Sequence, residues 1–279
     1  MLYIKKVYID TRFKTPDSKS DSDFFIELPR SLNVPENTIC YITDIVIPVS
    51  WLTIDSRNNT LYLYFNYDGF GPTMGHAGHT LTLPSKNYTG VSFAAALKTA
   101  LNAVHTVYYD KMVFDVVYNA ADTEITISQT NHFETLVYLV SSADLQAGRL
   151  WPSAVPKANI HSMNGILRIG TDSYKLSQAA PYVSHIDLLT IRNLYITSST
   201  LASYNVVSNF DNDVIIKKIP VRAGPGQMLF DSADAGYDFL DVSRRALSRI
   251  DFRLQDSYGN IVNLRNNHWS FSLVFQNRS

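Results

Sequence analysis

The sequence predicts an all-β protein: a jelly-roll β-sandwich with an inserted helix-plus-hairpin subdomain. Apolar and polar residues alternate with a period of two, as in half-buried strands, and the alternating runs are about five residues long. Gly, Pro, Asn and Asp interrupt the runs at short intervals, which is typical of sandwiches and not of βαβ units. One segment instead repeats its apolar residues at helical spacing, and this segment predicts the insertion.

Three strand patterns occupy the N-terminal third. Phe24, Ile26 and Leu28 alternate with Asp23, Phe25 and Glu27, and Pro29 is expected to end that strand because proline cannot donate to a ladder. Residues 39–47 are apolar on both parities, which indicates a central strand covered on both faces or covered by a partner subunit. The run 61–65 follows between turn signals. Further strands are predicted at residues 5–9, 80–83, 112–118, 124–128, 166–169, 194–197 and 214–219.

A helix is predicted from Ser92 to Val104, where large apolar residues recur at helical spacing among alanines. Ser92 or Thr89 is the expected N-cap. The strand patterns at 112–118 and 124–128 then form a hairpin. We therefore expect the sandwich at residues 1–67 and 161–279, and an inserted α+β subdomain at residues 68–160.

The C-terminal region contains the clearest alternation. Residues 250–254 place apolar side chains on one face and charges on the other, and the turn-rich segment 256–260 follows. Residues 261–264 resume the pattern, so a hairpin is predicted here. The final strand, 269–275, puts Trp269 on one face with Phe271, Leu273 and Phe275.

Composition excludes several classes of protein. The chain has 279 residues, 46% of them hydrophobic, which is too apolar for intrinsic disorder. Its single cysteine excludes a disulfide framework and a cysteine-based zinc cluster. With 24 Lys and Arg against 25 Asp and Glu, direct genome packaging is not expected, because that binding needs an excess of cations. No apolar run approaches the roughly 20 residues of a membrane span.

No catalytic, cofactor or metal site is predicted, and no cofactor is expected. The sequence lacks a G-x-S-x-G elbow, an H-E-x-x-H motif, a P-loop and a dinucleotide-binding glycine pattern. His76 and His79 form an H-x-x-H pair to which Asp68 could add a third ligand. We interpret them as solvated loop residues, because no third ligand stands at diagnostic spacing.

Other polar motifs have the same structural interpretation. The acidic clusters 211–213 and 231–234 offer oxygens to calcium, but a longer ligand series is needed, so hydrophilic turns are favoured. Cys40 lies in an apolar strand and is expected to be a small buried hydrophobe and not a nucleophile. Residues 224–226, Gly-Pro-Gly, predict a turn between strands.

The remaining candidates for binding are cationic and aromatic. Arg244, Arg245 and Arg249 form the one basic cluster of the sequence, for which ordinary ion pairs are favoured over an anion site. Trp269 is expected in the core, whereas Trp51 follows a strand and is a candidate for an interface rim. Trp151 is the third tryptophan.

The order of these segments resembles the penton-type minor capsid proteins of the double-stranded DNA viruses that include virophages, Polinton-like elements and adintoviruses. The segments that carry the resemblance are residues 23–29, 38–48, 50–51, 193–196, 199–202, 214–221, 250–254, 256–260 and 269–275, with the helix after 88–90 and the hairpin 114–118/125–128. The resemblance implies a single jelly roll that assembles as a homopentamer at the vertices of an icosahedral capsid and contacts the major capsid protein. It places the protein in the virion, assembled inside the host cell, and transfers no site residues.

Three functions follow from the sequence. The first is a structural virion protein, not an enzyme, whose work is subunit association. The alternative is a carbohydrate- or receptor-binding β-sandwich, with a host receptor or glycan as partner, suggested by the Asn- and Asp-rich loops at 56–60 and 209–213. A hydrolase built from scattered Asp, Glu and His residues is the least favoured.

The aromatic content supports the first function. The chain has 17 Tyr and 14 Phe, more than a core alone explains, and Tyr is enriched at interfaces. Phe25, Tyr62 and Tyr64 lie on the second face of their predicted strands, where a monomer would carry polar side chains. We expect these residues to form part of a subunit interface.

Overall fold

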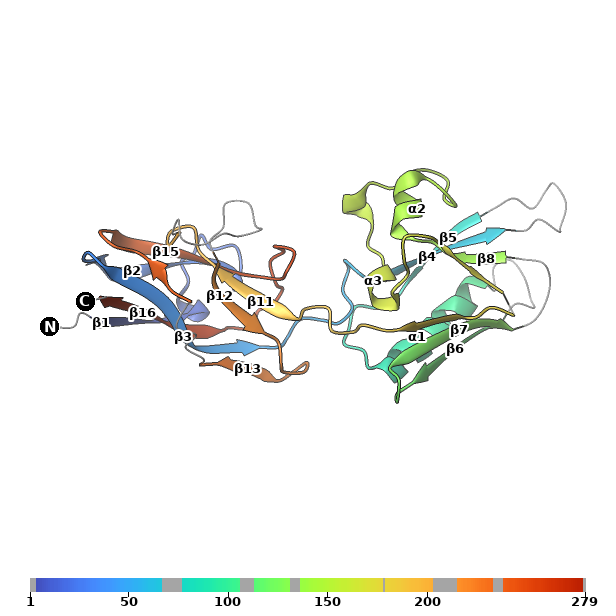
Figure 1. Ribbon diagram of the computed structural model, residues 1–279, viewed down its shortest axis with the longest axis horizontal. Helices are drawn as coiled ribbons and strands as arrows, with labels where there is room; N and C mark the ends of the chain where they lie inside the picture. Colours follow the sequence, from blue (N-terminus) through green and yellow to red (C-terminus); the bar gives the residue numbers. More distant parts are fainter. Residues whose placement is uncertain are drawn as a thin grey trace. The chain divides into compact units, whose positions relative to one another are not determined.

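The structure is a computed structural model that describes residues 4–66, 77–105, 113–130, 136–177, 179–202, 215–232 and 238–277. The chain divides into two compact units (Figure 1). The first, called here the sandwich unit, comprises Met1–Trp51 and Ile191–Ser279, and the second, the inserted unit, comprises Leu52–Thr190. Each unit has its own apolar core.

The inserted unit is wider than the expected residues 68–160. Strand β4 (Thr60–Asn66), which was expected in the sandwich, pairs with two strands of the inserted unit. Residues 161–190 also belong to this unit, because β9 (Tyr174–Leu176) and β10 (Tyr182–His185) complete its two sheets. Pairing over long sequence distances therefore places the boundaries at Trp51 and Ile191, away from the Pro- and Gly-rich segments that suggested 68 and 160.

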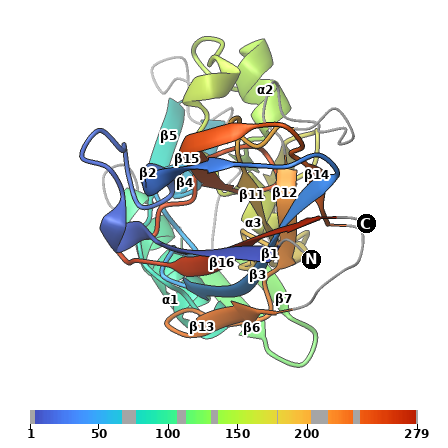
Figure 2. The same cartoon turned by 90° about the vertical axis from the view of Figure 1, so that its left-hand side faces the viewer.

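The sandwich unit consists of two antiparallel sheets, with β2 and β15 above and β1, β16 and β3 below in Figure 2. The first sheet has the order β1 (Ile4–Asp10), β16 (Ser270–Asn277), β3 (Thr38–Pro48), β13 (Met228–Asp231), and the short β14 (Leu240–Asp241) also pairs with β3. The second sheet has the order β12 (Ile215–Pro220), β11 (Asn193–Thr197), β15 (Ala246–Gln255), β2 (Asp23–Asn33).

These pairings confirm the predicted jelly roll. Leaving the short β14 aside, the eight strands of the sandwich unit pair first with last, second with seventh, third with sixth and fourth with fifth. That nesting is the rolled-up hairpin of a jelly roll. The inserted unit occupies the connection between the third and fourth of these strands, β3 and β11.

The core of the sandwich unit fills the space between its two sheets. An aromatic cluster forms its centre: Phe24 lies 5.7 Å from Phe252 and 5.8 Å from Trp269, and Phe252 lies 4.9 Å from Phe271 between ring centroids. All four side chains are buried. Tilted and edge-to-face pairs of this kind add about 1 kcal/mol each beyond the burial of their area.

Two predictions in this unit are wrong because strand pairing overrides the local pattern. Strand β2 does not end at Pro29. Its pairing with β15 slips between Glu27 and Leu32, so Pro29 lies in a bulge where no ladder hydrogen bond is required of it. Residues 261–264 do not form the second strand of a hairpin, and Ile261 makes a single bridge to Gln255. Both edges of β15 are already occupied, by β11 and β2.

The inserted unit also has two antiparallel sheets and, among the described residues, three α-helices. One sheet has the strand order β5 (Ala77–Thr82), β4, β8 (Leu136–Leu139), β9. The other sheet has the order β10, β7 (Glu124–Thr130), β6 (Val113–Asn119). The helices are α1 (Gly90–His105), α2 (Ser142–Ala147) and α3 (Asn164–Leu167). Two short 3-10 turns complete the described elements, η1 (Thr11–Phe13) in the sandwich unit and η2 (Lys157–Asn159) here. The predicted hairpin 112–118/124–128 is confirmed as β6 and β7.

Helix α1 confirms the predicted helix at 92–104. Thr89 precedes it as a cap: the Ser92 N–H donates to Thr89 Oγ1 at 3.2 Å, and the Thr89 N–H donates to Ser92 Oγ at 2.9 Å. Asn102 joins the helix to β6, since its Nδ2 donates to the Phe114 carbonyl at 2.9 Å and its Oδ1 accepts from the Phe114 N–H at 3.0 Å. This side chain therefore stands in for a strand partner at the sheet edge.

The strand predicted at residues 166–169 is wrong. The segment forms the single helical turn α3 and ends at Arg168, which has a φ of 58°. Ile166 and Leu167 are both buried, and neighbouring residues of a strand would point to opposite faces. A helical turn allows two consecutive side chains to enter the same core.

Replacing Gly90 with alanine is expected to destabilise the inserted unit. A Cβ at this position would overlap the Tyr118 ring, so the ring would have to move at a cost of about 1–3 kcal/mol in unfolding free energy. Urea denaturation of Gly90→Ala, Tyr118→Ala and the double variant measures this coupling. In the Tyr118→Ala background we expect Gly90→Ala to cost less than about 0.5 kcal/mol, and equal costs in both backgrounds would contradict the clash.

Candidate interaction surfaces

The residues considered as metal ligands form no cluster in the described part of the chain. The interpretation of His79 as a solvated loop residue is wrong, because it lies half-buried on β5, where its ring meets Phe65 edge-on at 5.2 Å and burial lowers the pKa of the imidazole. His76 and Asp68 lie outside the described residues. Within the ranges the structure describes, no group of three or more His, Cys, Asp or Glu side chains could hold a metal ion.

The acidic clusters are only partly described. Residues 211–213, 233 and 234 lie outside the described residues, and Asp231 is the last residue of β13. The prediction that Cys40 is a small buried hydrophobic residue is confirmed. It is fully buried in the sandwich core, and burial raises the pKa of its thiol. A thiol held protonated in an apolar core is a packing residue and not a nucleophile.

The basic cluster confirms the favoured interpretation as ordinary pairing. Arg244 forms an ion pair with Glu36, and Arg249 forms one with Asp17 while its guanidinium lies 4.1 Å from the centre of the Phe25 ring. Arg245 binds backbone instead, since its Nη1 donates to the carbonyl of residue 200 at 3.0 Å and its Nη2 to that of residue 202 at 2.5 Å. The three cations have different partners, which favours ordinary pairing over one shared anion site.

The tryptophans occupy three different environments. Trp269 is in the core of the sandwich unit, as predicted. Trp51 is also buried in that core, so its expected position at an interface rim is wrong. Trp151 packs edge-on against Tyr62 at 5.2 Å in the inserted unit. The Gly-Pro-Gly segment 224–226 forms the predicted turn, closed by the Gln227 N–H donating to the carbonyl of residue 224 at 3.1 Å.

The three aromatic residues expected at a subunit interface have partners within their own units. Tyr62 is buried beneath Trp151. Phe25 lies under the Arg249 guanidinium, and Tyr64 meets Tyr138 at 6.2 Å. Tyr62 is therefore wrong as an interface residue, because α2 and the segment after it cover this face of β4. Phe25 and Tyr64 are half-buried.

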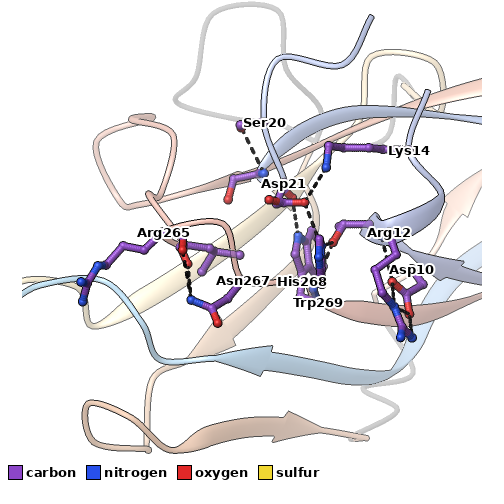
Figure 3. A network of polar contacts seen from close by, with 12 residues as sticks. Asp10, Arg12, Lys14, Ser20, Asp21, Arg265, Asn267, His268 and Trp269 are labelled. Carbon is purple, nitrogen blue, oxygen red and sulfur yellow. Dashed lines mark hydrogen bonds and ion pairs between the residues drawn. The ribbon is translucent and has the colours of Figure 1, made fainter. Parts of the chain in front are cut away.

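A polar cluster fastens the loop after β1 to the beginning of β16 (Figure 3). Lys14 Nζ donates to Asp21 Oδ1 at 2.8 Å, and the same oxygen lies 3.1 Å from His268 Nδ1. Trp269 Nε1 donates to the Asp21 carbonyl at 2.6 Å, and the Thr11 N–H donates to the Trp269 carbonyl at 3.1 Å. Because its groups are used to hold two loops together, the cluster is a structural clamp.

A second polar network holds the chain that leaves β11. Asp251 on β15 is buried, and its two oxygens accept hydrogen bonds from the segment 198–200. The backbone N–H groups of Ser199 and Thr200 donate to it at 2.9 and 2.7 Å, and their hydroxyls donate at 2.9 and 2.5 Å. Arg245 holds carbonyls of residues 200 and 202, so one carboxylate and one guanidinium together fix this part of the chain.

The outer face of the sheet β1-β16-β3-β13 is apolar, and sequence reasoning did not identify it. Ile9, Leu273, Phe275 and Leu229 point into the core, so the residues that alternate with them point outward. Four apolar side chains among these outward residues are exposed: Tyr8 by 77%, Phe230 by 71%, Ile4 by 57% and Met228 by 43%. We call this surface the apolar face; its outward residues are Ile4, Lys6, Tyr8, Asp10, Ile39, Tyr41, Thr43, Val46, Pro48, Met228, Phe230, Ser270, Ser272, Val274 and Gln276.

The outer face of the other sheet has the opposite character. Its cross-strand rows pair Glu27 with Arg249, Phe25 with Asp251, and Asp23 with Arg253. Arg253 Nε lies 3.5 Å from Asp23, and Thr197 donates to Gln255 at 2.8 Å. One face of the sandwich is thus charged and internally paired, and the other presents exposed aromatic and aliphatic side chains.

Comparison with known proteins gives a likeness of fold. No protein-family model matches the chain, and no curated protein matches its sequence. The crystal structure of the mavirus penton protein aligns with a TM-score of 0.55 and 10% identity over 98% of this chain and 99% of that one. The cryo-EM structure of the Sputnik virophage aligns with a TM-score of 0.42 and 14% identity over 98% of each chain.

The likeness to the mavirus penton protein confirms the fold that the sequence resemblance implied. It covers nearly the whole chain, so it includes the jelly roll and the inserted unit together. Among the described helices, none has both the length and the apolar composition needed to cross a membrane.

Proposed function

We propose that this chain is a structural protein of a virion, a penton-type minor capsid protein. The observation that carries the proposal is the fold: a jelly roll with an α+β insertion between its third and fourth strands, which aligns over almost its full length with the mavirus penton protein. Fold alone does not define function, so the surface must supply a second argument. The apolar face supplies it, because an exposed apolar sheet marks a site of protein association.

In this proposal the chain assembles as a homopentamer at the vertices of an icosahedral capsid and contacts the major capsid protein. It acts in the virion after assembly inside the host cell. Its work is association and not catalysis, which agrees with polar clusters that fasten loops, as around Asp21 and Asp251.

Sugar or receptor binding by the loop at 56–60 receives no specific support. Asn58 Oδ1 accepts from the Asp55 N–H at 2.8 Å, and its Nδ2 donates to the Thr53 carbonyl at 3.2 Å. Asn59 donates to the Leu83 carbonyl at 3.3 Å. Amides that shape their own loop are poorly placed to bind hydroxyl groups. The other loop of that hypothesis, 209–213, lies outside the described residues.

Native mass spectrometry of the purified chain tests the proposal. We expect a species of five times the 31.4 kDa chain mass, and five-fold rings in negative-stain images. A chain that stays monomeric at high concentration and binds no capsid component would contradict both the pentamer and the capsid function.

A further inference from the structure

We propose that the free edge of strand β1 accepts an extended polypeptide segment of a different capsid protein as an additional strand of the sheet. The inference rests on the proposed function and deepens it by assigning the place and the mode of one contact. Three observations support it: the direction of the backbone groups of β1, the state of the other edges of the sandwich unit, and the symmetry of a ring.

The hydrogen-bond pattern of β1 fixes the direction of its backbone groups. The Thr11 N–H donates to the Trp269 carbonyl at 3.1 Å, and the register between β1 and β16 continues without a shift along the whole of β1. In an antiparallel pair, residues that exchange hydrogen bonds with the partner strand alternate with residues that do not. Residues 5, 7 and 9 therefore bond to β16, and the N–H and C=O groups of residues 4, 6 and 8 point away from it.

We call the backbone N–H and C=O groups of Ile4, Lys6 and Tyr8 the open edge. Within the described ranges, β16 is the one strand that pairs with β1, and no loop backbone bonds to the open edge. The row ends before Asp10, where the chain turns into η1. Donors and acceptors that recur about every 7 Å along a line match the backbone of an extended peptide, so this chemistry selects a polypeptide strand as the ligand.

The other edges of the sandwich unit are covered, interrupted or short. The loop after β1 covers the start of β2, because the Thr15 N–H donates to the Phe25 carbonyl at 2.9 Å and the Phe25 N–H donates to Ser18 Oγ at 3.0 Å. Pro29 interrupts β2 further on, β12 ends at Pro220, and β13 has four residues. Natural sheets use such devices to prevent pairing between chains, and the seven residues of β1 include no proline and no bulge.

The charges of β1 leave the open edge accessible and indicate the kind of segment that fits it. Lysine also protects sheet edges, but Lys6 Nζ lies 2.5 Å from Asp44 on β3, so this charge is held over the outer face of the sheet. Lys5 is exposed on the other side of the strand, where Val7 packs against the sandwich core. A segment with an acidic residue beside Lys5 and an apolar residue beside Val7 therefore fits this edge.

Symmetry favours a different protein over a second copy as the source of the segment. Two identical edges that pair with each other are related by a two-fold axis and close after two copies, whereas the proposed pentamer needs a contact that repeats around a ring. In the described part of the sandwich unit, the remaining edges offer a neighbouring copy no strand of comparable length that is open. A segment of another protein needs only a free β1, and a pentamer would take one segment for each of its chains.

Amide hydrogen exchange tests the assignment on the protein itself. The exchange of single amides is compared between the isolated oligomer of this chain and the capsids that contain it. We expect the amides of Lys6 and Tyr8 to exchange at least about tenfold more slowly in the capsid, and the amide of Val7, which bonds to β16 in both states, to change little. Protection that is already present in the isolated oligomer would assign the edge to a second copy, and that result or unprotected amides in the capsid would overturn the inference.

Two variants of one residue separate the backbone group from the side chain. Tyr8→Ala and Tyr8→Pro both remove the ring, but only proline removes the N–H that points away from β16. Because no bond to β16 is lost, we expect both variants to unfold at similar urea concentrations, whereas Val7→Pro should be clearly destabilised. Tyr8→Pro should enter capsids at least about tenfold less than Tyr8→Ala. Equal incorporation of the two variants overturns the inference, and if Tyr8→Pro does not fold, the exchange experiment on the wild type decides.

The two proposals fail in distinguishable ways. If the chain forms a pentamer and enters capsids but its Lys6 and Tyr8 amides stay unprotected there, the inference fails and the proposed function stands. If the chain stays monomeric and is absent from capsids, the proposed function fails and the inference fails with it.

Discussion

Replacing Asp251 with asparagine is expected to destabilise the sandwich unit by about 3 kcal/mol in unfolding free energy. Both carboxylate oxygens accept hydrogen bonds from N–H and O–H groups of residues 198–200. An asparagine would turn its amide NH2 toward these donors, leaving one set of buried donors unpaired. Urea denaturation measures the difference. Glu27→Gln on the exposed outer face of the neighbouring strand is the control, with an expected change within about 0.5 kcal/mol.

The same substitution has a predicted pH dependence. Burial raises the pKa of Asp251, but hydrogen bonds from Thr200 and Ser199 together lower it more, so the folded pKa lies below the ordinary 3.8. A carboxyl with a lowered pKa stabilises the fold fully above its unfolded pKa and loses that contribution as the pH falls through the folded value. The advantage of the wild type over Asp251→Asn should be constant above about pH 5 and shrink below pH 3.8. An advantage that grows in acid would contradict the hydrogen-bonding account.

The elements that could be predicted from sequence are those specified by local patterns. The helix over 92–104 is set by its own apolar spacing, and the hairpin at 112–128 by two alternating runs around a polar turn. The errors arise where the decisive partner is distant in the chain. Residues 261–264 alternate like a strand, but β2 and β11 already occupy both edges of β15. No local pattern reports which edges are free.

The candidate surface was missed for a related reason. Alternation separates the two faces of a strand but does not say which face is covered when both are apolar. The expected interface residue Tyr62 is covered by Trp151, which lies 89 positions further along the chain. The strand 39–47 carries the signal that could have led to the apolar face. It is apolar on both parities, and the sequence predicted either that both of its faces are covered within the chain or that a partner subunit covers one of them. Its neighbours β16 and β13, with β1 beyond β16, extend the same face.

Truncating Trp269 to alanine is expected to cost about 3–5 kcal/mol, the largest loss predicted for this chain. The indole is buried, stacks on Phe271 at 4.9 Å and meets Phe24 edge-on at 5.8 Å, so its removal leaves a cavity in the centre of the aromatic cluster. Its Nε1 also donates to the Asp21 carbonyl at 2.6 Å, which ties the loop after β1 to the core. Packing and loop attachment therefore depend on one side chain.

Trp269→Phe separates these two contributions. Phenylalanine keeps an aromatic ring in the cluster but cannot donate to Asp21, so we expect an intermediate loss of about 1–2 kcal/mol and faster proteolysis within residues 11–22. Trp151→Ala, at a half-buried site in the inserted unit, is the size-matched control and should cost less than Trp269→Ala. Equal losses for the alanine and phenylalanine variants at position 269 would show that the hydrogen bond, and not the packing, dominates. The jelly roll would then depend on its loop clamp more than on its aromatic core.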